Sequence, residues 1–325
     1  MDQETRLERR EAARQNVRRR RRIALACALA LVAVGLLVVL GAGTLLGGGD
    51  ETQAQGEDER APAKLPGGGR SIFPERRVVA FYGAPQAREL GTLGIGSPQA
   101  AARRLKRQAR GYGQPGRPVL PAFELIATIV QSDPGDDGDH AWRQEPRTIA
   151  RYLRAARRND MLLILDIQPG YAPFIEEVRA LRRFLREPDV SVALDPEWRL
   201  EPPALPGQEI GSTDAATVNE VSAYLSRLVR RYRLPEKLLV VHRFTDEMIE
   251  NERALKNYPG VALTVNVDGF GDRPNKVSRY HSFTRGPERA KRPNGFKLFY
   301  EEDINLMPPK RVLRLRPAPD LVVYE

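Results

Sequence analysis

The chain has 325 residues, 41% of them hydrophobic, which suffices for one large folded domain or two ordinary ones and excludes a protein disordered throughout. Its formal net charge of +10 would favour nucleic-acid binding only if the basic residues covered a folded surface. Much of that excess lies instead in residues 1–22, where nine arginines stand against four acidic residues, so no nucleic-acid partner is predicted.

Residues 23–46 follow this basic tail as an apolar segment without a charged or amide side chain. As a helix they would span roughly 36 Å, enough for a hydrocarbon core of about 30 Å. Because the apolar core of a cleaved signal peptide is shorter, the segment predicts an uncleaved transmembrane helix, with cleavage after Ala54 as the alternative. The basic flank predicts a cytoplasmic N-terminus, a single pass through the cell membrane and an extracytoplasmic remainder.

Residues 47–70 are rich in glycine, proline and charged residues, which is typical of a flexible linker. The extracytoplasmic domain is predicted to comprise residues 71–325. The only cysteine, Cys27, lies in the apolar segment. The domain therefore has neither a disulfide nor a thiolate metal ligand.

Eight short apolar runs predict eight strands in this domain. In chain order they are residues 77–82, 119–124, 161–168, 190–195, 238–244, 261–268, 295–300 and 321–324. Helical patterns lie between them at residues 98–110, 146–158, 172–186, 214–233 and 246–256, with a short one at 309–315. The polar residues 273–294, which contain prolines, favour a long loop over a helix.

Strands that alternate with helices pair in parallel, and eight such units in about 250 residues predict a closed (β/α)8 barrel of TIM type. Because the chain ends at the eighth run, the last outer helix is predicted to be missing or reduced. An open, doubly wound sheet is the alternative. No glycine-rich phosphate loop follows a strand, which argues against a nucleotide-binding version, and no cofactor is predicted.

Residues two apart in a strand face the same side, and this parity brings polar residues to the carboxyl ends of six predicted strands. Active sites of such barrels lie at the mouth that these ends form. The residues predicted to line the mouth are Tyr82, Glu124, Asp166, Gln168, Asp195, Glu197, Trp198, His242, Asn266, Asp268 and Tyr300.

The strongest local signal is the sequence Asp195-Pro196-Glu197-Trp198. Proline restricts the residue before it to extended geometry, so the strand is predicted to continue and the two carboxylates to share a direction. Crowding and burial then raise the pKa of one of them, which provides an acid and a base at neutral pH. Trp198 offers a face on which a sugar ring stacks, or it packs in the core.

The motifs LDIQ (165–168), ALDPEW (193–198), VHRFT (241–245), DGFG (268–271) and GFKLFY (295–300) resemble a family of exported or membrane-anchored barrels from high-GC Gram-positive bacteria. The resemblance covers nearly the whole domain. More distantly, Asp-x-Glu at the end of the fourth strand is similar to glycoside hydrolases of this fold. That similarity implies a general-acid role for Glu197 and a supporting role for Asp195.

These observations favour a membrane-anchored glycoside hydrolase that acts on an envelope or extracellular glycan. In this hypothesis Glu197 protonates the leaving oxygen, and Asp195, Asp166 or Asp268 serves as nucleophile, base or cation stabiliser. The other mouth residues, Tyr82, Glu124, Gln168, Trp198, His242, Asn266 and Tyr300, would bind the substrate.

Two alternatives remain open. One is a barrel without catalytic activity that binds a glycan or a protein. The other is metal-assisted hydrolysis, with Asp166, Asp195, Glu197, His242 and Asp268 as ligands. The scarcity of histidine argues against zinc, and His242 serves equally well as an orienting residue, so no resident metal is predicted.

Overall fold

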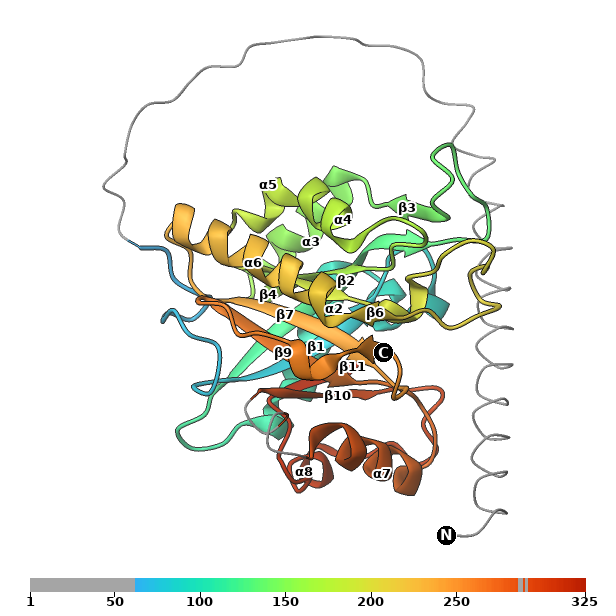
Figure 1. Cartoon of the computed structure of the whole chain (residues 1–325). Helices are drawn as coiled ribbons and strands as arrows, with labels where there is room; N and C mark the ends of the chain where they lie inside the picture. Colours follow the sequence, from blue (N-terminus) through green and yellow to red (C-terminus); the bar gives the residue numbers. More distant parts are fainter. Residues whose placement is uncertain (1–61, 286–288, 290–291) are drawn as a thin grey trace.

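Eight parallel strands close on themselves in the computed structural model, which describes residues 62–285, 289 and 292–325 (Figure 1). The strands are β1 (Arg77–Gly83), β2 (Val119–Val130), β4 (Leu162–Ile167), β5 (Val190–Leu194), β7 (Lys237–Arg243), β9 (Val261–Val267), β10 (Asn294–Leu298) and β11 (Leu321–Tyr324). Strand β1 pairs in parallel with both β11 and β2, which closes the barrel. The eight predicted strands and the TIM-type barrel are confirmed, and the open sheet is excluded.

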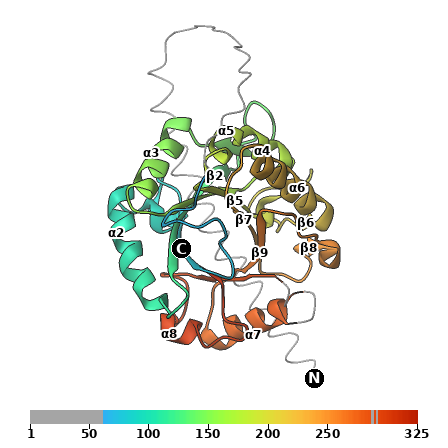
Figure 2. The same cartoon turned by 90° about the vertical axis from the view of Figure 1, so that its left-hand side faces the viewer.

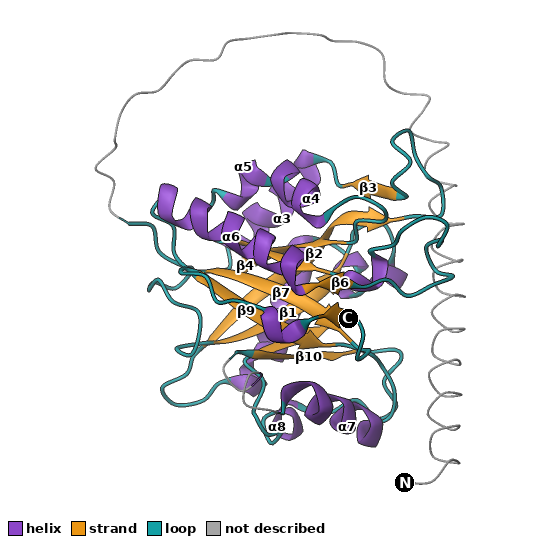
Figure 3. Ribbon diagram, viewed as in Figure 1, coloured by secondary structure: helices purple, strands orange, loops and turns teal. Residues whose placement is uncertain are grey.

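Helices surround the strands on the outside (Figures 2 and 3). They are α2 (Pro98–Ala109), α3 (Pro146–Arg157), α4 (Phe174–Ala180), α5 (Arg182–Leu185), α6 (Ala215–Arg231), α7 (Arg273–Thr284) and α8 (Pro309–Val312). Short 3-10 helices lie at Arg88–Leu90 (η1), Thr92–Gly94 (η2), Arg110–Tyr112 (η3), Pro196–Trp198 (η4) and Glu252–Ala254 (η5). Strand β3 (Ala141–Arg143) adds antiparallel to the end of β2, and β6 (Thr213–Asp214) pairs with β8 (Ile249–Glu250).

Three helix predictions need correction. The predicted helix 172–186 begins only at Phe174 and is interrupted at Leu181, which separates α4 from α5. The predicted helix 246–256 is wrong, because this segment forms β8 and a 3-10 turn. The Arg243 guanidinium fixes this folded-back loop through the carbonyls of Thr245 and Asp246 and the Glu252 carboxylate.

The segment expected to be a long loop contains helix α7. Asp272 caps this helix, because its side chain accepts a hydrogen bond from the Asn275 amide at 2.9 Å. Pro274 lies in the first turn, where a missing amide hydrogen costs nothing. The proline that appeared to disfavour a helix therefore favours its start.

The barrel interior changes from apolar at the amino ends of the strands to polar at their carboxyl ends. Val78, Leu120, Leu162 and Leu238 fill the lower end, and small residues such as Ala80, Ala122 and Ala193 follow above them. Residues of the opposite parity pack against the helices in a separate outer core. Apolar packing thus stabilises the floor, while the mouth is left for polar side chains.

A segment before β1 closes the floor of the barrel. Leu65 and Ile72 are buried in the interior cluster. The Glu236 carboxylate accepts a hydrogen bond from the Ile72 amide at 2.5 Å, and Arg70 donates to the Leu234 carbonyl at 2.7 Å. Residues 65–72 are therefore part of the folded barrel.

The predicted tail 1–22, the transmembrane helix 23–46 and most of the linker 47–70 lie outside the described residues. Within the described part of the chain, no helix is both long and apolar enough to cross a bilayer.

Lys237, at the amino end of β7, is buried and donates to the carbonyls of Glu187 and Val190. Burial lowers the pKa of Lys237 to about 7, although nearby Asp189 and Glu187 favour its charge. The pKa of lysine is higher in the unfolded chain than in this buried site. Between the two pKa values unfolding therefore takes up a proton, so the contribution of Lys237 to stability rises with pH in that range.

We therefore expect the free energy of unfolding of the wild type, relative to that of Lys237→Met, to increase by about 2–3 kcal/mol between pH 6 and pH 9. Urea unfolding at the two pH values measures it. The exposed control Lys256→Met should show no such change. A pH-independent difference for Lys237→Met would contradict the assignment.

Candidate active site

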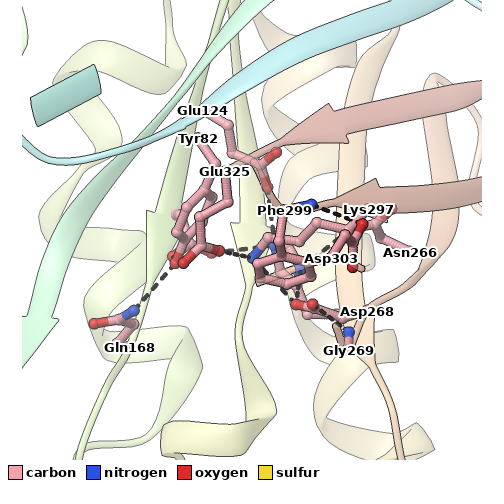
Figure 4. A network of polar contacts seen from close by, with 12 residues as sticks. Tyr82, Glu124, Gln168, Asn266, Asp268, Gly269, Lys297, Phe299, Asp303 and Glu325 are labelled. Carbon is pink, nitrogen blue, oxygen red and sulfur yellow. Dashed lines mark hydrogen bonds and ion pairs between the residues drawn. The ribbon is translucent and has the colours of Figure 1, made fainter. Parts of the chain in front are cut away.

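A buried polar network occupies the carboxyl-terminal mouth of the barrel (Figure 4). Its members from the strands and the residues just after them are Tyr82, Glu124, Asp166, Gln168, Asp195, His242, Asn266, Asp268, Lys297 and Glu325. They come from β1, β2, β4, β5, β7, β9, β10 and β11, so every barrel strand contributes. The closed barrel thereby brings together residues up to 243 positions apart in the chain.

His242 is the centre of the network. Its Nε2 lies 2.9 Å from Glu124 Oε1 and 3.7 Å from Asp166 Oδ1. On the other side of the ring, Nδ1 lies 3.2 Å from Asp268 Oδ2 and 3.3 Å from Asn266 Nδ2. Burial lowers the pKa of His242, but hydrogen bonds to Asp268 and Glu124 outweigh it and raise the pKa well above the ordinary value.

Tyr82 connects β1 to the carboxylates. Its hydroxyl donates to Asp166 Oδ2 at 3.0 Å and accepts from Gln168 Nε2 at 3.1 Å. Gln168 is held in turn by the Val130 amide, which donates to its side-chain oxygen at 3.2 Å. These bonds fix one oxygen of Asp166 and leave the other directed towards His242.

Lys297 is the main site residue that the sequence prediction missed. Its Nζ lies 3.1 Å from Asp268 Oδ2 and 2.6 Å from Glu325 Oε2, and 3.8 Å from the centre of the Tyr82 ring. Burial alone would lower the pKa of Lys297, but Asp268 and Glu325 raise it, so the ammonium is charged. A lysine inside the apolar run GFKLFY was the available signal, and strand parity likewise puts Glu325 with the inward Val323.

A second buried lysine supports the loops beneath the network. Lys276 of α7 lies 2.9 Å from Asp303 and donates to the carbonyls of Gly269 and Lys297. Asp303 also accepts hydrogen bonds from the amides of Gly271 and Phe299. This pair positions the loop after Asp268, and helix α7, expected to be a loop, supplies its lysine.

Tyr300 does not join the other residues that were predicted to line the mouth. Gly295 and Lys297 face the interior, whereas Phe296 and Leu298 pack in the outer core. Tyr300 follows the outward set: it is 40% exposed, stacks on Tyr324 and donates to Gln108 of α2. It therefore lies outside the mouth.

The Asp195-to-Trp198 segment also differs from the prediction. Strand β5 ends at Leu194, and Pro196–Trp198 form a 3-10 turn instead of continuing the strand. Asp195 keeps a non-helical conformation before the proline, but Pro196 itself begins the helical turn, a position where proline is favourable. Asp195 and Glu197 nevertheless remain close enough for Glu197 to raise the pKa of Asp195. Trp198 is half-buried.

Burial is the largest cause of the raised pKa values of two carboxyls in the network, those of Asp195 and Asp166. It raises the pKa of Asp195 to about 7, with His242 acting against the shift and Glu197 adding to it. Burial and the charge of Asp195 raise the pKa of Asp166 as well. Carboxyls of this kind keep a proton near neutral pH, which general acid catalysis requires.

Three buried oxygens in the network lack a hydrogen-bond donor among the described residues: Glu124 Oε2, Asp166 Oδ1 and Asn266 Oδ1. The network holds six carboxyls, those of Glu124, Asp166, Asp195, Glu197, Asp268 and Glu325, against the cations Lys297 and protonated His242. Glu124, Asp166 and His242 each offer one ligand atom, and these atoms lie within 4.8 Å of one another, so this trio is suited to hold a metal ion.

A separate hollow of about 420 Å³ lies outside the barrel wall, beside the β2–β3 hairpin. Arg143 and Glu177, which line it, form an ion pair, and Glu177 accepts a hydrogen bond from Thr128. The exposed acidic loop 133–138 borders the hollow, away from the His242 network.

The strand order and the polar mouth together define a TIM-type (β/α)8 barrel with a candidate active site at the usual end. No protein-family model matches the chain, and no curated protein sequence matches it. Among solved structures the chain is similar to a sialic acid aldolase of Ruminococcus gnavus, at 10% identity and a TM-score of 0.38, over 77% of this chain and 68% of that one.

It is also similar to a D-allulose 3-epimerase from Methylomonas sp., at 12% identity and a TM-score of 0.36, over 78% of this chain and 86% of that one. Likenesses of this degree carry no argument about activity. The fold class rests on the strand pairing of the chain itself.

Proposed function

We propose that this protein is a membrane-anchored, extracytoplasmic glycoside-hydrolase-like barrel that cleaves an envelope or extracellular glycan by carboxylate acid/base catalysis. The observation that carries the proposal is the neighbouring pair of carboxyls, Asp195 and Glu197, at the carboxyl-terminal mouth of the barrel. Their residues are 4% and 7% exposed, whereas Glu124, Asp166 and His242 are fully buried. A substrate at the mouth therefore reaches this pair more readily than those three residues.

The roles within the pair follow from their surroundings. Asp195, with its pKa raised to about 7 chiefly by burial, is the general acid that protonates the glycosidic oxygen as the bond to the anomeric carbon breaks. Glu197 is the second carboxylate, which attacks the anomeric carbon or takes a proton from the attacking water. This assignment exchanges the roles that the sequence favoured, because burial acts on Asp195.

Reducing-end release tests the activity. The full chain, purified in detergent, is incubated with isolated cell-wall glycan and a panel of soluble polysaccharides, with and without a chelator. We expect release from at least one substrate by the wild type. Binding of a glycan without release, by wild type and by Glu197→Gln alike, would contradict the hydrolase and identify a binding barrel.

The location is a proposal with its own test. Residues 23–46 would anchor the chain, with residues 1–22 in the cytoplasm. Protease added to intact cells should remove the barrel domain while a tag at the N-terminus stays protected until the cells are opened. Protection of both ends would contradict the proposed orientation.

A further inference from the structure

We propose that Glu124, Asp166 and His242 form a binding site for one divalent cation, below the pair Asp195 and Glu197. The three side chains come from β2, β4 and β7, and none is exposed to solvent. The site would hold a first-row divalent ion, for which Mn²⁺ is the probe. This inference goes beyond the proposed hydrolysis, and its test does not depend on whether the protein is a hydrolase.

The spacing of the ligand atoms supports the site. One ligand atom from each residue lies within 4.8 Å of the others, and His242 Nε2 lies 2.9 Å from Glu124 Oε1 and 3.7 Å from Asp166 Oδ1. An ion at about 2.0–2.2 Å from each ligand keeps its ligands within about 4.4 Å of one another. Side-chain shifts of a few tenths of an ångström therefore suffice to close the site.

Unpaired oxygens supply the second, independent observation. Glu124 Oε2 and Asp166 Oδ1 are buried without a donor among the described residues. Asp166 Oδ2 already accepts from Tyr82, whereas the only partner of Glu124 Oε1 in this trio is His242 Nε2, whose proton an ion would replace. Buried acceptors without a partner are costly, and a cation between them removes that cost.

Neighbouring side chains orient the three proposed ligands, as hydrogen-bond partners of metal ligands do in known metal sites. Asp268 Oδ2 lies 3.2 Å from His242 Nδ1, so a hydrogen on Nδ1 points to this carboxylate. Nε2 faces the two acids and would bind the ion after releasing its proton to solvent. Lys297 in turn holds Asp268 at 3.1 Å. The Tyr82 hydroxyl fixes Asp166 in the same way. Each proposed ligand thus has a partner that sets its direction.

Charge and ligand type limit the choice of ion. Two carboxylates and one imidazole combine oxygen and nitrogen ligands, which suits Mn²⁺ better than Ca²⁺, because Ca²⁺ requires six to eight oxygen ligands. Because the trio is fully buried, the ion would be retained through purification.

The test measures metal content and Mn²⁺ affinity, so it does not depend on hydrolysis. The full chain is purified without chelator and analysed for metal content, then stripped, and its affinity for Mn²⁺ is followed by electron paramagnetic resonance and by the thermal unfolding midpoint. We expect one equivalent of a divalent ion and a higher midpoint with Mn²⁺. Glu124→Gln and Asp166→Asn should each abolish the midpoint shift, and Asp268→Asn should weaken Mn²⁺ binding about 10- to 100-fold.

Matched controls separate this site from others. Glu177→Gln removes a buried carboxyl outside the barrel wall and should bind Mn²⁺ like the wild type. Asp195→Asn should also keep the metal while losing hydrolysis, so the two proposals fail separately. Absence of a midpoint shift in the wild type, or equal binding by Glu124→Gln, Asp166→Asn and the wild type, would overturn the site. Far-ultraviolet circular dichroism confirms that each variant is folded.

Discussion

Replacement of Asp195 by Asn is expected to lower kcat/KM for glycan hydrolysis by about 10²- to 10⁴-fold, the range that a positioned general acid contributes. The amide keeps the shape of the side chain but has no proton of suitable acidity to donate. Initial rates of reducing-end release measure the loss. The exposed control Asp136→Asn should hydrolyse at the wild-type rate.

The pH profile separates a catalytic from a structural role of Asp195. Because the acid must be protonated and burial raises its pKa to about 7, the wild-type rate should fall as the pH rises through about 7. The residual activity of Asp195→Asn should lack this decline. A variant with unchanged kcat/KM and an unchanged basic limb would show that another group donates the proton.

Replacement of Lys297 by Met is expected to cost about 3–5 kcal/mol of folding stability, because it removes the ammonium group that pairs with both the buried Asp268 and the Glu325 carboxyl. Methionine fills a similar volume, so lost packing contributes little. Chemical unfolding at pH 7, with far-ultraviolet circular dichroism as the signal, measures the change. The exposed lysine variant Lys310→Met should lie within about 0.5 kcal/mol of wild type.

A double variant tests the cause of that loss. Lys297→Met combined with Asp268→Asn removes both a buried cation and a buried anion, and it should be more stable than Lys297→Met alone. If the double variant is the less stable of the two, the ion pair is not the reason for the effect of Lys297.

The fold could be predicted because its determinants are local. Each strand is a short apolar run such as MLLILDIQ, and the alternation of runs with helical stripes such as Val218, Val221 and Leu225 implies parallel pairing. The errors occurred where individual side-chain hydrogen bonds decide the backbone. Arg243 folds the predicted helix 246–256 into a loop, and the Asp272 cap makes a helix where prolines suggested none.

The site could be predicted only in part, for a similar reason. Parity identified the inward residues of strands with clear alternation, such as Asp166 and His242. It was not applied to β10, where the inward set is Gly295 and Lys297 and the aromatic Tyr300 belongs to the outward set. Gly295 has no side chain because Asn266 occupies that space: an added Cβ would lie 2.4 Å from Asn266 Oδ1. No pattern within one strand reveals such a contact.

Residues 65–72, which close the floor of the barrel, limit the side from which a ligand can approach. Leu65 and Ile72 pack against the apolar residues that fill the amino end of the barrel, so the carboxyl-terminal mouth is the end from which a ligand reaches the polar network. The chain also enters the barrel at the sealed end. The segment that leads into β1 and the polar mouth therefore lie at opposite ends of the barrel.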